Sequence, residues 1–154
     1  PVTVVAAGAK AILDVPKTLE VLETLGVPVI AYGQDVVPAF WSSKSLHKAP
    51  LRLDDANSIA KAQKMRTALG LPGGQLIANP IPAEAEIPRS EMEPVIERAL
   101  SDAITHGIAG KSVTPYLLQR VFELTEGRSL TANIALVLNN AALAAQIACE
   151  MADN

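Results

Sequence analysis

Residues 2–14 read VTVVAAGAKAILD, and the arrangement of the rest of the chain can be worked out from this stretch. The β-branched run at 2–5 predicts a buried strand, and residues 6–9 then have almost no side chain. Lys10 follows directly, and Asp14 is suited to begin a helix. A strand that turns toward a helix ends at the carboxyl edge of a sheet, where open α/β sheets bind their ligands. The stretch therefore predicts an α/β fold with Lys10 at a ligand-binding edge.

Lys10 is the first candidate functional residue. A lysine amine among methyl groups and a glycine loses hydration, which lowers its pKa and lets it attack a carbonyl carbon. On this interpretation Lys10 forms a Schiff base. The alternative is a lysine at a strand end, whose stem packs on apolar surface while its amine reaches water. The pattern alone is compatible with both.

The composition is that of a globular protein of one domain. The chain has 154 residues, of which 49% are hydrophobic and 19% are charged. A net charge of −3 and 3% aromatic residues give no reason to expect a nucleic acid polymer or a membrane as partner. Cys149 is the only cysteine, which favours a reducing compartment, and we expect the cytoplasm. His47 and His106 have no metal-ligand spacing.

The segments that follow predict alternating helices and strands. The strand–helix–strand order over residues 2–32 has the size of a βαβ unit and favours a parallel pair of strands. Residues 34–53 show no regular period, and this loop is interpreted as a lid, a subunit contact or a segment anchored to the core by Phe40 and Trp41. Further elements are expected as a helix at 58–69, a strand at 75–78, and helices at 90–106, 114–124 and 130–151.

Several asparagines accompany these elements. Asn79 ends the strand at 75–78 and is expected either to cap its own turn or to reach the edge that carries Lys10. The helix at 130–151 is almost wholly apolar, but its amides make a membrane span costly, so we expect a central helix of a soluble fold. Asn133 and Asn140 share one face of that helix. Their partners would be backbone groups or a polar ligand such as the edge of a nucleobase.

Seven segments together resemble one family. The segments are AAGAKAILD (6–14), GVPVIAYG (26–33), VPAFW (37–41), LRLDDANSIA (51–60), LIANPIP (76–82), GKSVTPYLLQRVFELT (110–125) and SLTANIALVLNNAALAAQIA (129–148). They run in order through essentially the whole chain, and AGAK with ILD and ANPIP are the most specific among them. Together they resemble the C-terminal half of the pseudouridine-5′-phosphate glycosidase family, also called indigoidine synthase A-like.

The resemblance implies a fold and a partner. The family fold is a three-layer α/β/α sandwich, and residues 1–154 would be the C-terminal half of a single such domain, supplying part of the central sheet and several flanking helices. The N-terminal half of the same protein, absent from this chain, would then be its partner. The buried type of the first strand, which begins at once after Pro1, also leads us to expect the second half of a longer protein. The family forms homotrimers.

The resemblance also implies an activity. The family enzyme, a lyase of the hydro-lyase class, reversibly cleaves the C–C glycosidic bond of pseudouridine 5′-phosphate to uracil and ribose 5-phosphate. The family lysine that forms a Schiff base with C1 of the opened sugar falls on Lys10, and the asparagine that contacts uracil falls on Asn133. The family uses Mn²⁺, whose ligand, like the general acid, would lie in the missing half, so no metal ligand is expected in this chain.

Three functional hypotheses follow. A C-glycoside has no leaving-group oxygen to protonate, so the two-carboxylate logic of ordinary glycosidases does not apply, and an iminium formed by a lysine fits the chemistry. The first hypothesis is therefore a C-glycosidase that is inactive without its other half. The second is a different Schiff-base lyase of phosphosugars, of aldolase type. The third is a non-catalytic fragment or interaction module of the same family.

Overall fold

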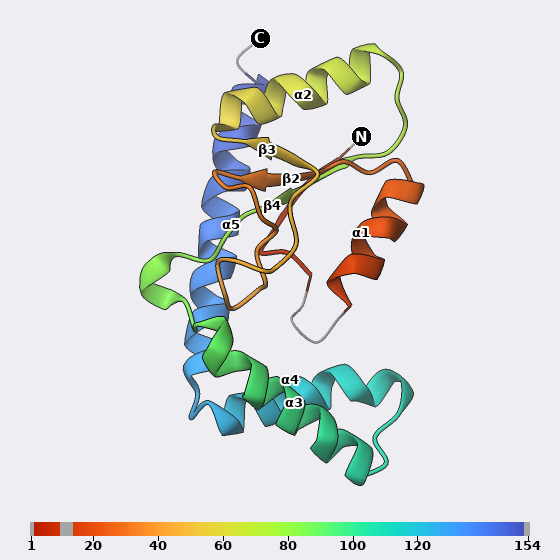
Figure 1. The fold of residues 1–154 in the computed structure, drawn as a ribbon. Helices are drawn as coiled ribbons and strands as arrows, with labels where there is room; N and C mark the ends of the chain where they lie inside the picture. The colour runs from red at the N-terminus through yellow and green to blue at the C-terminus, as the bar shows by residue number, and fades with distance from the viewer. Residues whose placement is uncertain (1, 10–13, 153–154) are drawn as a thin grey trace.

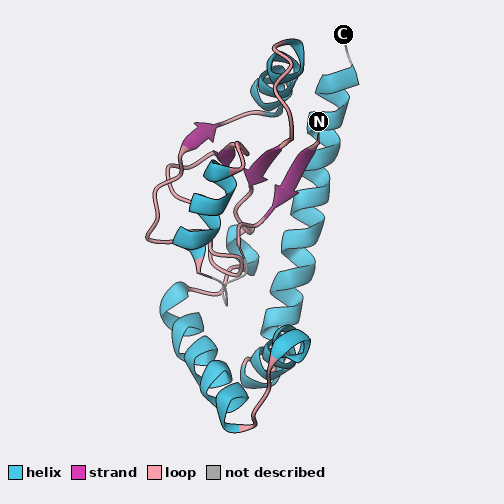
Figure 2. Ribbon diagram, turned by 90° about the vertical axis from the view of Figure 1, so that its right-hand side faces the viewer, coloured by secondary structure: helices cyan, strands magenta, loops and turns pink. Residues whose placement is uncertain are grey.

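The computed structural model describes residues 2–9 and 14–152 of the chain. These residues form a mixed α/β fold around a sheet of four parallel strands (Figure 1). Helix α1 lies in front of one face of the sheet, whereas α2 and α5 pack on the other (Figure 2). The predicted α/β class is confirmed. The elements are β1 (Thr3–Ala6), α1 (Val15–Thr24), β2 (Val29–Tyr32), β3 (Leu51–Leu53), α2 (Ala56–Ala68), β4 (Gln75–Ala78), α3 (Arg89–Thr105), α4 (Val113–Leu124) and α5 (Arg128–Ala152), with short 3₁₀ turns at Ala83–Ala85 and Gly110–Ser112.

The strands lie in the order β1–β4–β2–β3. The expected parallel orientation of β1 and β2 is confirmed, but the two strands are not neighbours, because β4 lies between them and pairs with both. Ile77 and Ala78 of β4 are fully buried there, as expected for an inner strand of a parallel sheet. β3 was not expected, because a strand of three residues is too short to show a period.

One core lies between the sheet and the α2–α5 pair. Val5, Ile77 and Ile30 are aligned in register on three neighbouring strands and point to the same face. Ile59 of α2 and Leu143 of α5 pack against them, together with Ile147. Asp55 begins α2, since its carboxylate accepts from the backbone N–H of Ser58 at 2.7 Å. These contacts fix the first strand and the last helix relative to one another.

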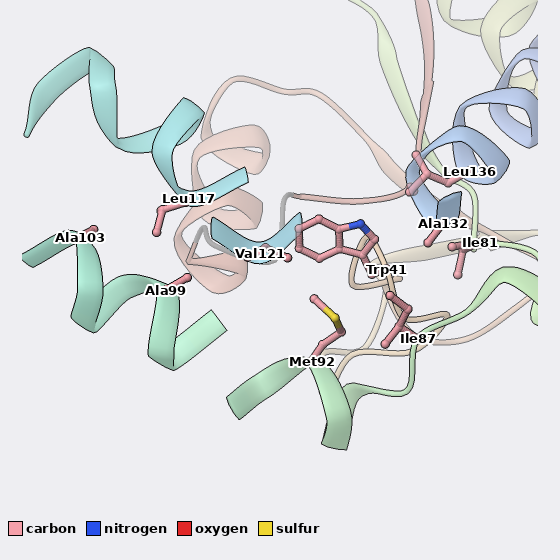
Figure 3. Close-up of a cluster of buried hydrophobic side chains, with 11 residues drawn as sticks. Trp41, Ile81, Ile87, Met92, Ala99, Ala103, Leu117, Val121, Ala132 and Leu136 are labelled. Carbon is pink, nitrogen blue, oxygen red and sulfur yellow. The ribbon is translucent and has the colours of Figure 1, made fainter. Parts of the chain in front are cut away.

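A second core surrounds Trp41, at the end of the molecule where α3 and α4 form a hairpin. Figure 3 shows its indole ring between Met92 of α3 and Val121 of α4 on one side and Ala132 of α5 on the other. The Trp41 side chain is 3% exposed, and its indole N–H donates to the carbonyl oxygen of Ser129 at 3.1 Å. Of the three interpretations of residues 34–53, this contact supports the loop anchored to the core.

Helix α5 differs from the expectation of a central helix. Only one side of it is buried within the described residues, through Ala132, Leu136, Leu143 and Ile147. Its opposite side is apolar and exposed. By length and hydropathy alone, α5 would also be able to cross a membrane. The described part of the chain therefore leaves an apolar helix half covered.

Candidate functional site at the carboxyl end of the sheet

The end of β1 is held tightly against the loop that carries Trp41. Ala7 is buried, and its carbonyl oxygen accepts from the backbone N–H of Phe40 at 3.0 Å. Gly8 has φ +87°, and a Cβ at this position would lie 2.3 Å from the carbonyl oxygen of Pro38. Only glycine satisfies both the left-handed backbone and this close approach. The small residues of the opening stretch thus let the loop pack directly on the strand end.

Lys10 itself lies outside the described residues, together with 11–13. The structure places the residues on either side of it. Gly8 follows β1, and Asp14 begins α1 by accepting from the backbone N–H of Lys17 at 3.1 Å. This hydrogen bond, with the nearby Lys17 ammonium, lowers the pKa of Asp14. The role of Lys10 as a nucleophile, and its lowered pKa, therefore stay predictions.

Asn79 joins the same edge to α5. It follows β4, where Ala78 is in register with Ala6, and its backbone N–H donates to the Ala6 carbonyl oxygen at 2.8 Å. The Asn79 side chain is buried, and its Nδ2 donates to Oδ1 of Asn140 at 3.1 Å. The prediction that it caps its own turn is wrong, because the amide is used to hold the helix. Asn79 does lie beside the carboxyl end of β1, as expected, whereas the position of Lys10 at that edge stays a prediction.

Asn133 lies one turn into α5, beside an open cavity of about 420 Å³. The two other asparagines of this helix are used within the fold: Asn140 pairs with Asn79, and Asn139 donates to the Pro80 carbonyl oxygen at 3.0 Å. Within the described residues the half-buried amide of Asn133 has no hydrogen-bond partner. It is therefore available to a ligand. The cavity is lined by Trp41, Pro115, Leu118, Gln119, Phe122, Ser129, Leu130 and Asn133.

Trp41 connects this cavity to the strand end. Its neighbour Phe40 bonds to Ala7 at the end of β1, and its own indole bonds to Ser129, one turn before Asn133. Phe40 has φ +62°, and its ring meets that of Trp41 edge to face at 4.9 Å. The position of the only tryptophan in an aperiodic loop allowed this anchor to be predicted from the sequence. The left-handed backbone of Phe40 and the contribution of α4 to the cavity wall could not be predicted in this way.

A flat, weakly polar ring suits the walls of this cavity. Its surface is mostly apolar and includes Phe122, which is 38% exposed and whose ring a nucleobase can stack on. The Asn133 and Gln119 amides supply both donors and acceptors for the polar edge of such a ring. Gln119 at present donates to the Glu123 carboxylate at 3.0 Å. In residues 2–9 and 14–152, no three His, Cys, Asp or Glu side chains come together as a possible metal site.

Comparison with known sequences gives consistent matches along the chain. The family model described as indigoidine synthase A like protein matches residues 1–150. The pseudouridine-5′-phosphate glycosidase of Paracoccus denitrificans (strain Pd 1222) is 72% identical over 152 residues, which cover 99% of this chain and 50% of that relative. The protein of the same name from Roseobacter denitrificans is 70% identical and matches 96% of this chain and 48% of its own length. The chain spans about half the length of the curated relatives it matches.

Two solved structures are similar to this fold. The prealnumycin C-glycosynthase AlnA, crystallised in complex with ribulose 5-phosphate, superposes with a TM-score of 0.88 at 33% sequence identity. An indigoidine synthase A-like protein from Thermotoga maritima superposes with a TM-score of 0.83 at 36% identity. The matches cover 97% and 95% of this chain but only 49% and 48% of the two structures. Both neighbours thus contain as much chain again outside the shared region.

Proposed function

This chain belongs to the indigoidine synthase A like protein family, and we propose that it supplies half of an enzyme that reversibly cleaves pseudouridine 5′-phosphate to uracil and ribose 5-phosphate. The observation that carries the proposal is the 72% identity, over nearly the whole chain, with a relative named pseudouridine-5′-phosphate glycosidase. The names of these relatives support an enzyme that acts on a C-glycoside. The proposal further assigns this enzyme to the hydro-lyase class and places it in the cytoplasm.

In this proposal Lys10 is the nucleophile. Its amine attacks C1 of the ribose as the bond from C1 to the ring oxygen breaks, and the ring oxygen takes up the proton that the nitrogen releases. The nitrogen lone pair then forms a C=N⁺ bond as the C–C bond to uracil breaks. The bonding electron pair stays on the uracil carbon, which takes up a proton from a general acid. Water then releases ribose 5-phosphate from the iminium and regenerates the amine. The support for Lys10 is its place after the packed end of β1, between Gly8 and α1.

Asn133 is proposed to bind the uracil. Its amide lines the cavity beside Trp41 and has no partner in the described part of the chain, whereas Asn139 and Asn140 are both bonded. A primary amide presents one acceptor and one donor side by side, which matches the adjacent N–H and C=O groups of a uracil edge. The apolar walls offer contact area to the faces of the uracil ring.

The other half of the protein completes the site. We propose that the general acid and the ligand of the expected Mn²⁺ lie in that half, and that the working enzyme is a homotrimer. The described residues offer no group of three donors for Mn²⁺, so no step is assigned to a metal on this chain. On this proposal the isolated chain is inactive, because it has a nucleophile and part of a uracil site but no acid.

A second candidate is a different Schiff-base reaction on a phosphosugar. A structural neighbour is a C-glycosynthase bound to ribulose 5-phosphate, which favours C–C bond chemistry on a pentose phosphate without fixing the second reactant. The leaving group separates the two candidates: the glycosidase requires uracil, whereas an aldolase-type lyase does not. A non-catalytic module is the third candidate, and the presence of Lys10 speaks against it.

Borohydride trapping tests the proposal directly. The chain is co-expressed with the half of the Paracoccus denitrificans relative that it does not match, and the complex is treated with ribose 5-phosphate and sodium borohydride. We expect intact mass and peptide mapping to show one reduced sugar-phosphate adduct on Lys10. No adduct in a complex that contains both polypeptides would contradict the Schiff-base assignment. An adduct without uracil release from pseudouridine 5′-phosphate would favour the aldolase-type reaction.

A further inference from the structure

One side of α5 is apolar along almost its whole length and is not covered by any described residue. The residues on it recur at helical spacing and are all exposed, with Leu138 65% exposed. They lie opposite the side that packs on α2 and the sheet through Leu143 and Ile147. We call this set the α5 stripe: Leu130, Ile134, Val137, Leu138, Ala141, Ala145 and Ala148.

The sheet is unfinished on the same side of the molecule. β1 pairs with β4 on one side, and on its other side no described strand pairs with it. Helix α5 runs beside β1 (Figure 2). The carbonyl oxygens of Val2 and Ala6 accept from β4 and the residue after it, so Thr3 and Val5 present their backbone groups to the open side of the ladder. Val4, on the other face of β1, is 50% exposed. An apolar, unpaired edge strand of this kind is normally covered or paired in a soluble protein.

From these two features we infer that the edge of β1 and the α5 stripe form one docking surface for the other half of the same protein. A strand of that half pairs with β1 and extends the sheet, and a helix of it packs along the stripe. This inference rests on the proposed function in so far as that proposal assigns the other half to the same enzyme. It explains why α5, which has the composition of a central helix, is half exposed in this chain.

The known relatives argue for this occupant. Their matched region accounts for about half of each chain, so they contain as much again that has to pack somewhere. A bilayer would cover the stripe but leaves the backbone groups of Thr3 and Val5 unpaired. Asn139 and Asn140 also bind α5 to the end of β4, which keeps the helix with the sheet. A second copy of this chain would cover the surface, but the other half of the protein would then have no comparable apolar surface on which to pack.

Leu138→Glu tests the docking surface. The chain is co-expressed, with a tag on it alone, with the unmatched half of the Paracoccus denitrificans relative, and native mass spectrometry measures how much partner is retained. The matched control is Leu69→Glu, since Leu69 is 67% exposed at the end of α2, away from the stripe. We expect the wild type and the control to retain one partner per chain, and Leu138→Glu to retain at least about ten-fold less. Circular dichroism checks that both variants are folded.

Three results would overturn the inference. The first is a Leu138→Glu chain that keeps its partner. The second is an oligomer of the isolated chain that dissociates when Leu138→Glu is introduced, which would show that the α5 stripe binds a second copy of the chain. The third is sedimentation of the isolated chain with phosphatidylcholine–phosphatidylglycerol vesicles that the variant loses, which would assign it to a bilayer. A complex that assembles as expected but cleaves no pseudouridine 5′-phosphate would instead contradict the proposed function and leave the docking surface standing.

Discussion

Gly8 is the residue whose replacement should disturb the site most directly. Alanine there would have to adopt φ +87° and would place its Cβ 2.3 Å from a backbone oxygen that cannot rotate away. We expect Gly8→Ala to lower the free energy of unfolding by about 2–4 kcal/mol, the left-handed cost plus that of overpacking. Urea denaturation measures it. The control is Gly26→Ala, with φ +67° and nothing within 4 Å, which should lose only about 1 kcal/mol. Equal losses would mean that the contact with Pro38 does not constrain the strand end.

Lys10 is expected to be indispensable to the reaction. In the complex with the other half, Lys10→Arg should lower the turnover of pseudouridine 5′-phosphate by about a thousand-fold or more and abolish the borohydride adduct, because a guanidinium forms no Schiff base. Uracil release, followed by absorbance, measures the first effect. Lys17→Arg is the control on the same segment, since Lys17 is exposed and, among the residues that the structure describes, pairs only with Asp14. An adduct that persists in Lys10→Arg would place the nucleophile elsewhere.

Asn133 should act on uracil and not on the sugar. In the synthetic direction, Asn133→Ala should raise the KM for uracil by roughly 10- to 100-fold, the value of one or two lost hydrogen bonds, and leave the KM for ribose 5-phosphate within about two-fold. Asn139→Ala is the control on the same helix. It loses the bond to the Pro80 carbonyl oxygen and should cost stability, by about 1 kcal/mol, without a selective effect on uracil. An equal rise in the KM values for uracil and for ribose 5-phosphate in Asn133→Ala would show that Asn133 has a structural role and does not bind uracil specifically.

At the scale of elements, the contact between α3 and α4 depends on pH through Asp102. The Arg120 guanidinium donates to its carboxylate at 2.8 Å, and Arg98 approaches at 3.1 Å, so the pKa of Asp102 is lowered. A carboxyl group with a lower pKa in the folded state adds stability above its unfolded pKa and loses it as the pH falls through the folded value. This contribution is therefore fully present at pH 7 and is lost progressively as the pH falls below about 5.

Asp102→Asn checks this pairing. The variant should be less stable than the wild type at pH 7, and the difference should shrink as the pH falls from about 5 to about 2. Urea midpoints at each pH give the difference between the two proteins. Comparison within each pH removes the shared titration of groups that do not contact Asp102, such as Glu91, whose pKa is lowered by its hydrogen bond with Arg128. A difference that stays constant with pH would show that Asp102 acts through packing and not through charge.

Elements with a strong local pattern were predictable from the sequence. The strand at 75–78 and the helical periods of α3 and α5 were placed to within about two residues. The order of the strands was not, because β4 takes its place between β1 and β2 through burial on both sides, which no local pattern records. Similarly, Asn133 could be proposed from its resemblance to a family, but its cavity depends on α4 and Trp41, which are distant in sequence.

At the scale of the whole molecule, the chain has two buried cores, but one strand edge and one apolar helix side stay uncovered in the described residues. The carboxyl ends of β1 and β4 and the start of α5 meet around Trp41, so the end of β1 and the cavity beside Asn133 are joined by one core. The edge of β1 and the α5 stripe, in contrast, have no cover in the described residues. The division is consistent with a site assembled from both halves of a longer protein.

The last prediction concerns what each half supplies. The isolated chain should release no uracil from pseudouridine 5′-phosphate, with or without added Mn²⁺, because its described residues contain no group of three metal ligands and the acid is expected elsewhere. The complex with the other half should be active, should lose activity on treatment with EDTA, and should regain it with Mn²⁺. Inductively coupled plasma mass spectrometry, which measures bound manganese without reference to activity, should find it in the complex and not in the isolated chain. Manganese retained by the chain alone, or turnover by it, would move the metal ligand into residues 1–154 and would contradict the division of the site between the two halves.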